Sequence, residues 1–180
     1  MSQERYQVRF EWGDAGVRRI AAGTHVVVVA DELDGHGRAS AAQLAAAIAE
    51  TVGDGPAVLC VTEASSQAAA AWILRLQESV GDRAIVAVVG AGSIDDDGYR
   101  FAVEDHFAAG AVIDALASVG IDFSSPEAAA ACASFTKLRR ATGHLLTASV
   151  SATGGAQDPA GQRAAHPAVV TVLREFSPPA

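Results

Sequence analysis

The sequence is poor in basic residues and has no long apolar segment, and each shortage argues against a class of function. Only 13 Lys and Arg residues stand against 21 Asp and Glu, which gives a net charge of −8. Binding to phosphate backbones needs a basic face, so we expect no nucleic-acid partner. The longest apolar β-run, Val26–Ala30, is far too short to cross a bilayer, so we expect no membrane partner either.

Cysteine is also scarce, and no targeting segment is recognisable. Cys60 and Cys132 both lie in apolar or Ala-rich surroundings, which is typical of small buried side chains in a reducing cytosol. The first residues do not combine a basic start, an apolar run and a cleavage site. We therefore expect a cytoplasmic protein whose 180 residues form one domain, 1–180.

Several common catalytic motifs are missing as well. The five His residues show no H-x-x-x-H or H-E-x-x-H spacing, so zinc is not supported. There is no P-loop, and the Gly90-Ala91-Gly92 turn lacks the third glycine and the helix of a dinucleotide site. Leu33 stands where a haloacid-dehalogenase-type phosphatase needs a second Asp. Ser66 stands where a cysteine phosphatase built on Cys60 needs an Arg.

What the chain does contain is an alternation of strands and helices. This pattern predicts an α/β fold, a three-layer α/β/α arrangement with a mostly parallel or mixed central sheet. The first and last strands are expected to pair antiparallel at an edge, and Ser151–His166 to form a loop. The predicted strands are Tyr6–Trp12, Thr24–Ala30, Ala57–Thr62, Ala84–Val89 and Val169–Leu173. The predicted helices are Val17–Ala22, Ser40–Val52, Ser66–Glu78, Val103–Gly120, Ser125–Arg140 and Gly143–Ser149.

Carboxylates mark a candidate ligand site within this pattern. Asp31 ends the most strongly β-branched strand, and Glu104 and Asp105 open a helix that follows a Gly-rich turn. Strand ends and helix starts are where α/β proteins bind ligands, and hard oxygen donors suit Mg²⁺. Plain structural roles are open too: Asp31 can cap a turn, and Glu104 and Asp105 can interact with the helix dipole. Adjacent helical residues point about 100° apart, so at most one of Glu104 and Asp105 is expected to face a given site.

Several stretches, taken in order, resemble the 2-phosphosulfolactate phosphatase family. The most specific is Gly98–Leu116 (GYRFAVEDHFAAGAVIDAL), similar to a family segment that carries an E-D pair before a small-residue helix. Further stretches with this similarity are Val8–Gly13 (VRFEWG), Val26–Leu33 (VVVVADEL), Ala64–Ile73 (ASSQAAAAWI) and Ala141–Leu146 (ATGHLL). The resemblance implies a Mg²⁺-dependent phosphomonoester hydrolase with an α/β/α fold, which converts 2-phosphosulfolactate to sulfolactate and phosphate.

The resemblance also implies roles for individual residues. Asp31, Glu104 and Asp105 would hold Mg²⁺ or activate water, and His144 would act as an acid or substrate ligand. The residues expected to bind substrate are Arg38, Ser40, Ser65, Ser66, Gly90 and Gly92. The chain lacks the family's T-T-x-N-G-T loop, which keeps open an inactive family member that binds a small ligand or a partner. A third alternative is a homodimer in which the partner completes the site.

Overall fold

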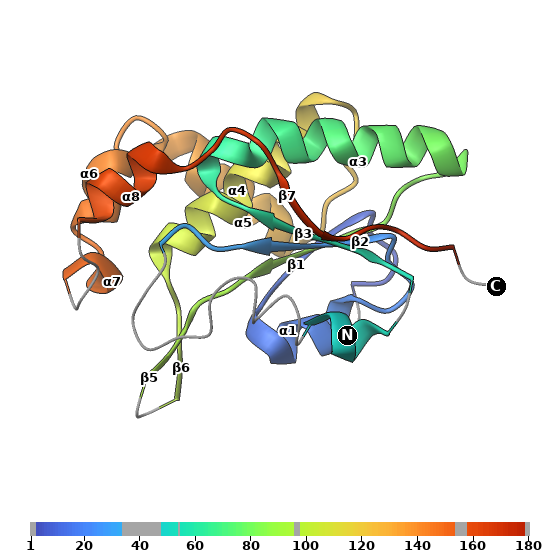
Figure 1. Cartoon of the computed structure of the whole chain (residues 1–180), viewed down its shortest axis with the longest axis horizontal. Helices are drawn as coiled ribbons and strands as arrows, with labels where there is room; N and C mark the ends of the chain where they lie inside the picture. The colour runs from blue at the N-terminus through green and yellow to red at the C-terminus, as the bar shows by residue number, and fades with distance from the viewer. Residues whose placement is uncertain (1–2, 34–47, 54, 96–97, 154–157, 179–180) are drawn as a thin grey trace.

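The computed structural model describes residues 3–33, 48–53, 55–95, 98–153 and 158–178. Its main sheet has five strands in the order β1-β4-β2-β3-β7 (Figure 1). The first four of these strands run parallel, and β7 pairs antiparallel with β3 at one edge. The strands are β1 (Val8–Trp12), β2 (Val26–Ala30), β3 (Ala57–Val61), β4 (Val86–Gly90) and β7 (Thr171–Arg174).

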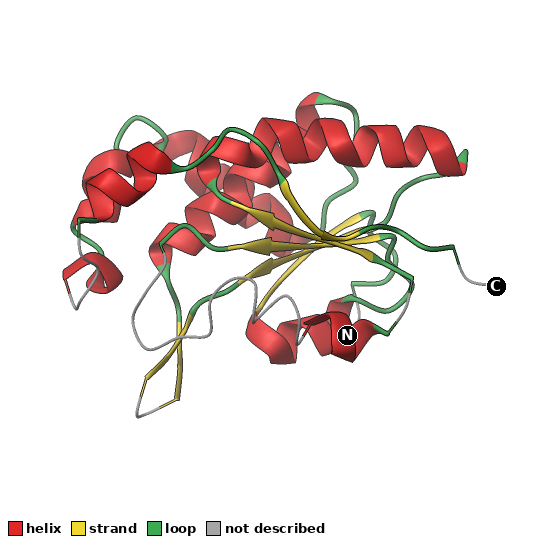
Figure 2. Ribbon diagram, viewed as in Figure 1, coloured by secondary structure: helices red, strands yellow, loops and turns green. Residues whose placement is uncertain are grey.

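Two helical layers cover the sheet, which confirms the predicted α/β/α arrangement (Figure 2). One face packs against the long helices of the chain in a core that includes Val28, Val88 and Leu116. The other face packs against α1 and the helical segment 48–52, through residues such as Val29 and Ile48. The helices are α1 (Gly13–Ile20), α3 (Ser66–Val80), α4 (Val103–Ser118), α5 (Pro126–Leu138), α6 (Thr142–Thr147), α7 (Val150–Thr153) and α8 (Pro159–Ala165), with a short 3-10 turn η1 (Glu63–Ser65).

The continuous β-branched runs were correctly predicted as central strands. All five residues of β2 and all five of β4 are buried, because helices cover both faces of a parallel sheet. The start of the α5 helix was also predicted correctly. Ser125 accepts a hydrogen bond from the Ala128 amide, and Pro126 occupies the first helical position.

Two expectations about secondary structure were wrong. β1 does not pair with the last strand; it pairs parallel with β4 at the opposite edge from β7. The segment Ser151–His166, predicted as a loop, contains most of α7 and all of α8. Asp158 caps α8 by accepting from the Gly161 amide at 3.0 Å, a local signal that outweighs the Gly and Pro content.

A two-stranded hairpin that the sequence did not reveal follows β4. β5 (Ser93–Asp95) and β6 (Gly98–Arg100) pair antiparallel and project away from the sheet (Figure 1). At its base Tyr99 lies against Gly92, where an added Cβ would come within 2.0 Å of the Tyr99 hydroxyl oxygen. Gly92 also has φ +65°, so backbone conformation and packing both require glycine here.

Candidate functional site

The carboxyl ends of the parallel strands form a crevice around the end of β2. The next described helical segment after β2, 48–52, lies on one face of the sheet, whereas α3 and α4, which follow β3 and β4 on either side of β2, lie on the other face. Neighbouring strands whose connections depart to opposite faces create the crevice in which open α/β sheets bind ligands. Asp31 N–H donates to Val61 O and Ala91 N–H to Ala30 O, so these strand ends are tied together.

Asp105 braces this crevice from the first turn of α4. Its Oδ1 accepts a hydrogen bond from the Glu32 amide at 3.0 Å, and its Oδ2 accepts one from the Gly92 amide at 2.8 Å. One carboxylate therefore joins the chain after β2 to the turn after β4, two segments far apart in sequence. Both of its oxygens are engaged with backbone, which makes Asp105 a positioning residue for Asp31 and Glu32.

The electrostatic surroundings of Asp105 oppose its ionisation. Complete burial raises the pKa of the Asp105 carboxyl well above its usual range, and the negative charges of Asp31 and Glu104 raise this pKa further. The two amide donors act in the opposite direction but do not outweigh burial. Asp31 and Glu104 are therefore both close enough to Asp105 to influence its ionisation.

Glu104 is nearly as buried as its neighbour but is not satisfied in the same way. Its side chain is 1% exposed, and Oε1 has no hydrogen-bond partner among the described residues. Both adjacent carboxylates are buried because α4 is covered on most of its circumference, but Asp105 is the one that bonds to the backbone of the crevice. Within the described segments, no set of three or more His, Cys, Asp or Glu side chains is arranged to hold a metal ion.

A small pocket opens beside Asp31, between the ends of β2 and β3 and the approach to β7. Its volume is about 170 Å³, and its wall includes Asp31, Glu32, Thr62 and His166. Cys60 also lines this pocket and is only partly buried, which corrects the expectation of a fully buried core thiol. A larger hollow of about 500 Å³ lies at the amino-terminal ends of β2 and β3, and no carboxylate of the described residues lines it.

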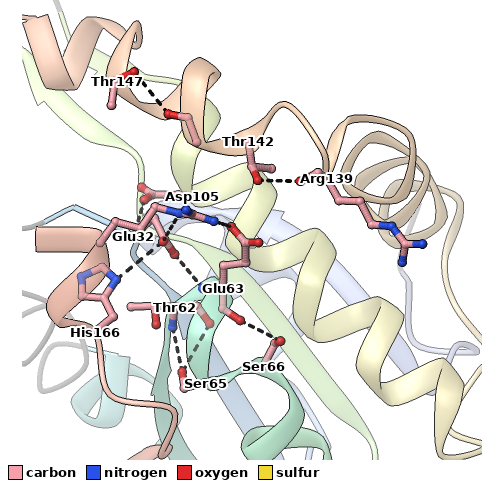
Figure 3. A network of polar contacts seen from close by, with 12 residues as sticks. Glu32, Thr62, Glu63, Ser65, Ser66, Asp105, Arg139, Thr142, Thr147 and His166 are labelled. Atoms are coloured by element: carbon pink, nitrogen blue, oxygen red, sulfur yellow. Dashed lines mark hydrogen bonds and ion pairs between the residues drawn. The ribbon is translucent and has the colours of Figure 1, made fainter. Parts of the chain in front are cut away.

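Two basic side chains reach the acidic crevice from the region of α8 (Figure 3). Arg163 Nη2 lies 2.7 Å from Glu63 Oε2, and its Nε lies 3.9 Å from Glu32 Oε1. His166 Nδ1 lies 3.6 Å from the same Glu32 oxygen. Glu32 itself is 1% exposed, and its Oε2 accepts the Glu63 amide at 2.6 Å. A buried carboxylate thus stands between a guanidinium and an imidazole at the rim of the pocket.

The residues expected to bind substrate are differently placed. Ser65 lines the pocket, and its hydroxyl accepts the Thr62 amide, while the Ser66 hydroxyl donates to Glu63 O. The Gly92 amide already donates a hydrogen bond to Asp105. The position of a Gly90 Cβ is filled by the Trp12 ring, 2.5 Å away.

The remaining expected site residues are not brought to the carboxylates. His144 is exposed on α6, and none of the described contacts joins it to Asp31, Glu104 or Asp105. Arg38 and Ser40 lie outside the described residues, as does most of the predicted Ser40–Val52 helix.

Sequence reasoning missed Glu32, Glu63, Arg163 and His166. Glu32 directly follows Asp31, and that adjacency at a strand end was the available signal. Arg163 and His166 are three residues apart, a spacing that places two side chains on one side of a helix and its continuation. That signal was lost because the segment was predicted as a loop. Glu63 and Arg163 are 100 positions apart in sequence, so no local pattern connects them.

No protein-family model matches the chain, and a search of curated proteins finds no significant match. Fold and site geometry therefore carry the functional argument. None of the helices in the described part of the chain is long and apolar enough to span a membrane.

Proposed function

We propose that this chain is a Mg²⁺-dependent phosphomonoester hydrolase that acts on a small phosphorylated acid, as the 2-phosphosulfolactate phosphatases do. The observation that carries the proposal is the crevice at the end of β2. There Asp31 lines a pocket, Asp105 braces the surrounding backbone, and polar side chains from η1 complete the wall. This crevice is where open α/β sheets generally bind their ligands.

The described residues divide into distinct roles in this proposal. Asp31 is the general base that takes a proton from the attacking water. It lines the pocket, whereas the oxygens of Glu32, the other carboxylate in the wall, face the Glu63 amide, Arg163 and His166. Asp105 acts through the backbone it holds and is a positioning residue. Thr62 and Ser65 line the pocket, and their side chains would contact the phosphoryl oxygens.

The donor chemistry of the site fits Mg²⁺. Mg²⁺ is commonly bound by one or two carboxylates together with substrate phosphate and water, so a closed set of three protein ligands is not required. Asp31 would hold the ion, and the buried Oε1 of Glu104, which has no hydrogen-bond partner among the described residues, is the second candidate. When bound, the ion would neutralise the charge of the phosphoryl group.

The competing proposal is a protein that binds a small anion without chemistry. It is favoured by the two hydrogen bonds from backbone amides that already engage Asp105, and by the absence of a three-ligand cluster among the described residues. It predicts phosphate-dependent stabilisation without turnover.

Phosphate release distinguishes the two proposals. The chain should release phosphate from 2-phosphosulfolactate or 2-phosphoglycolate with Mg²⁺, and EDTA should abolish the release. Asp31→Asn should lower kcat by about 10² to 10⁴, the usual contribution of a general base, while the melting temperature stays close to that of the parent. Asp122→Asn changes an exposed carboxylate in the same way and should behave like the parent. No release above background from any small phosphoester would refute the hydrolase proposal. The protein that binds a small anion would then be the remaining proposal.

A further inference from the structure

His166 is the histidine that the fold brings to the candidate site. It follows α8 directly, lines the pocket together with Asp31, and its side chain is 16% exposed. His144, the histidine that the sequence pointed to, is exposed on α6. A group that donates or accepts a proton in catalysis must reach the bound substrate, so position in the pocket favours His166.

Glu32 holds this imidazole from the inner side of the pocket. Its Oε2 is fixed by the Glu63 amide at 2.6 Å, which leaves Oε1 directed to His166 Nδ1 at 3.6 Å (Figure 3). A buried carboxylate beside one ring nitrogen fixes the orientation of an imidazole and stabilises its protonated form. Such contacts are often long without substrate and shorten once it is bound.

The other charged groups around His166 come from three elements. Arg163 belongs to the same helix, and its positive charge is balanced by Glu63 at 2.7 Å and by Glu32 at 3.9 Å. Asp31 adds a negative charge from the end of β2, and the Cys60 thiol lies in the pocket wall on β3. Three carboxylates and one guanidinium therefore lie around the imidazole, and Glu32 is the carboxylate that faces its Nδ1.

We propose that His166 is the general acid of the hydrolysis proposed above, held in position by Glu32. The water oxygen attacks phosphorus as the bond from phosphorus to the ester oxygen breaks. The electron pair of that bond stays with the ester oxygen, which takes a proton from His166. Asp31 takes a proton from the attacking water, so the products are the hydroxy acid and inorganic phosphate. Exchange with solvent then returns His166 and Asp31 to their starting states.

This role rests on the proposed hydrolase function, and it makes a distinct demand on the leaving group. An alkyl oxygen, such as that of 2-phosphoglycolate, is a poor leaving group and needs the proton. The phenolate of p-nitrophenyl phosphate is stable without one. Loss of a general acid therefore slows the alkyl ester far more than the aryl ester, whereas a damaged fold or phosphate site slows both alike.

The test compares kcat for the two esters in His166→Ala, His144→Ala and Glu32→Gln. His166→Ala should lose at least about 100-fold with 2-phosphoglycolate and less than about 10-fold with p-nitrophenyl phosphate. Glu32→Gln should show the same selectivity, and the double variant should lose little more than His166→Ala alone, because both changes remove one function. Equal losses on both esters, or a selective loss in His144→Ala instead, would overturn the assignment.

A second measurement tests the pairing without turnover. In two-bond ¹H–¹⁵N spectra, Glu32→Gln should shift the ring nitrogens of His166, identified by their loss in His166→Ala. The ring nitrogens of His25, which precedes β2 at the end of the strand opposite to the site, should stay unchanged. Unshifted His166 signals would overturn the positioning role of Glu32. Failure of the parent to turn over either ester would overturn the hydrolase function and the acid role together.

Discussion

A single residue, Asp105, both secures the crevice and weakens the fold at neutral pH. Its two oxygens accept hydrogen bonds from backbone amides that follow two strands. Removing the Asp105 side chain would therefore leave these buried donors without partners. Burial nevertheless raises the pKa of its carboxyl, which means that folding disfavours the ionised form. The contribution of this group to stability is complete below its unfolded pKa of about 3.9 and is lost as pH rises through the higher folded pKa.

Asp105→Asn separates these two effects. The amide oxygen can accept one backbone N–H, but the amide nitrogen faces the other, which costs about 1–3 kcal/mol in the free energy of unfolding. The variant has no charge to bury. Its loss in the free energy of unfolding, relative to the parent, should therefore be largest near pH 4 and become smaller toward pH 7. Chemical denaturation at a series of pH values measures this difference. Asp122→Asn, an exposed carboxylate, should show no such trend, and a deficit that grows with pH would contradict the argument.

How far single residues could be predicted from the sequence depended on their neighbours in the chain. Asp31 and Asp105 were found because each sits at the end or start of a strongly patterned element. Glu32, Arg163 and His166 acquire their roles from contacts between the end of β2 and the region of α8, and the local spacing near them does not specify those contacts. The direction of each side chain in the crevice follows from tertiary packing, which periodicity does not specify.

At the scale of elements, the packing of α4 on α5 depends on a glycine. A Cβ at Gly110 would come within 2.4 Å of Ala131 O and 2.6 Å of Phe135 Cβ. The two helices therefore approach through the space that a side chain would need. α4 also presents Glu104 and Asp105 to the site, so this contact helps to set where the carboxylates lie.

Gly110→Ala should therefore destabilise the protein. Alanine gains up to about 1 kcal/mol in helix propensity, but the forced separation of two packed helices costs about 1–3 kcal/mol. Because Ala131 O is backbone and cannot swing aside, we expect the second effect to prevail. Gly143→Ala in α6 is the matched control, since a Cβ there meets only Arg163 Nη1 at 3.7 Å. Thermal and denaturant unfolding should show a loss for the first variant and none for the second; equal stability of both would refute the packing argument.

The sequence predicted long elements better than short ones for a physical reason. Helices such as α4 and α5 were expected close to their observed bounds, because many residues contribute to their pattern. The hairpin β5–β6 has three residues in each strand, too few for period-two alternation to be recognised, and its acidic turn resembles a solvated loop. Short α8 depends on the Asp158 cap and its contacts with the crevice.

For the whole molecule, stability should decrease from the parallel core toward β7. The four parallel strands form the core, and β2 and β4 are completely buried, whereas β7 alternates exposed and partly buried residues and is flanked by Val169, 65% exposed. β7 is anchored through Arg174, whose Nε donates to Pro56 O at 3.0 Å and whose Nη1 donates to Ala49 O at 3.2 Å. Elements with few buried contacts open without global unfolding.

Native-state hydrogen exchange tests this order. Amides of β7 should exchange with a lower opening free energy than amides of β2 and β4. Arg174→Ala should lower the opening free energy of the β7 amides further, by about 1–3 kcal/mol, because two hydrogen bonds from a charged group are lost. The opening free energies of the β2 and β4 amides should not change. Arg83→Ala removes an exposed arginine that follows the C-terminal end of α3, and it should change neither the β7 amides nor those of β2 and β4. Because His166 lies between α8 and β7, early opening of β7 would also loosen one wall of the candidate site. If β7 and the central strands exchange together in both variants, the edge strand is an integral part of the cooperative fold, and the site wall is as rigid as the core.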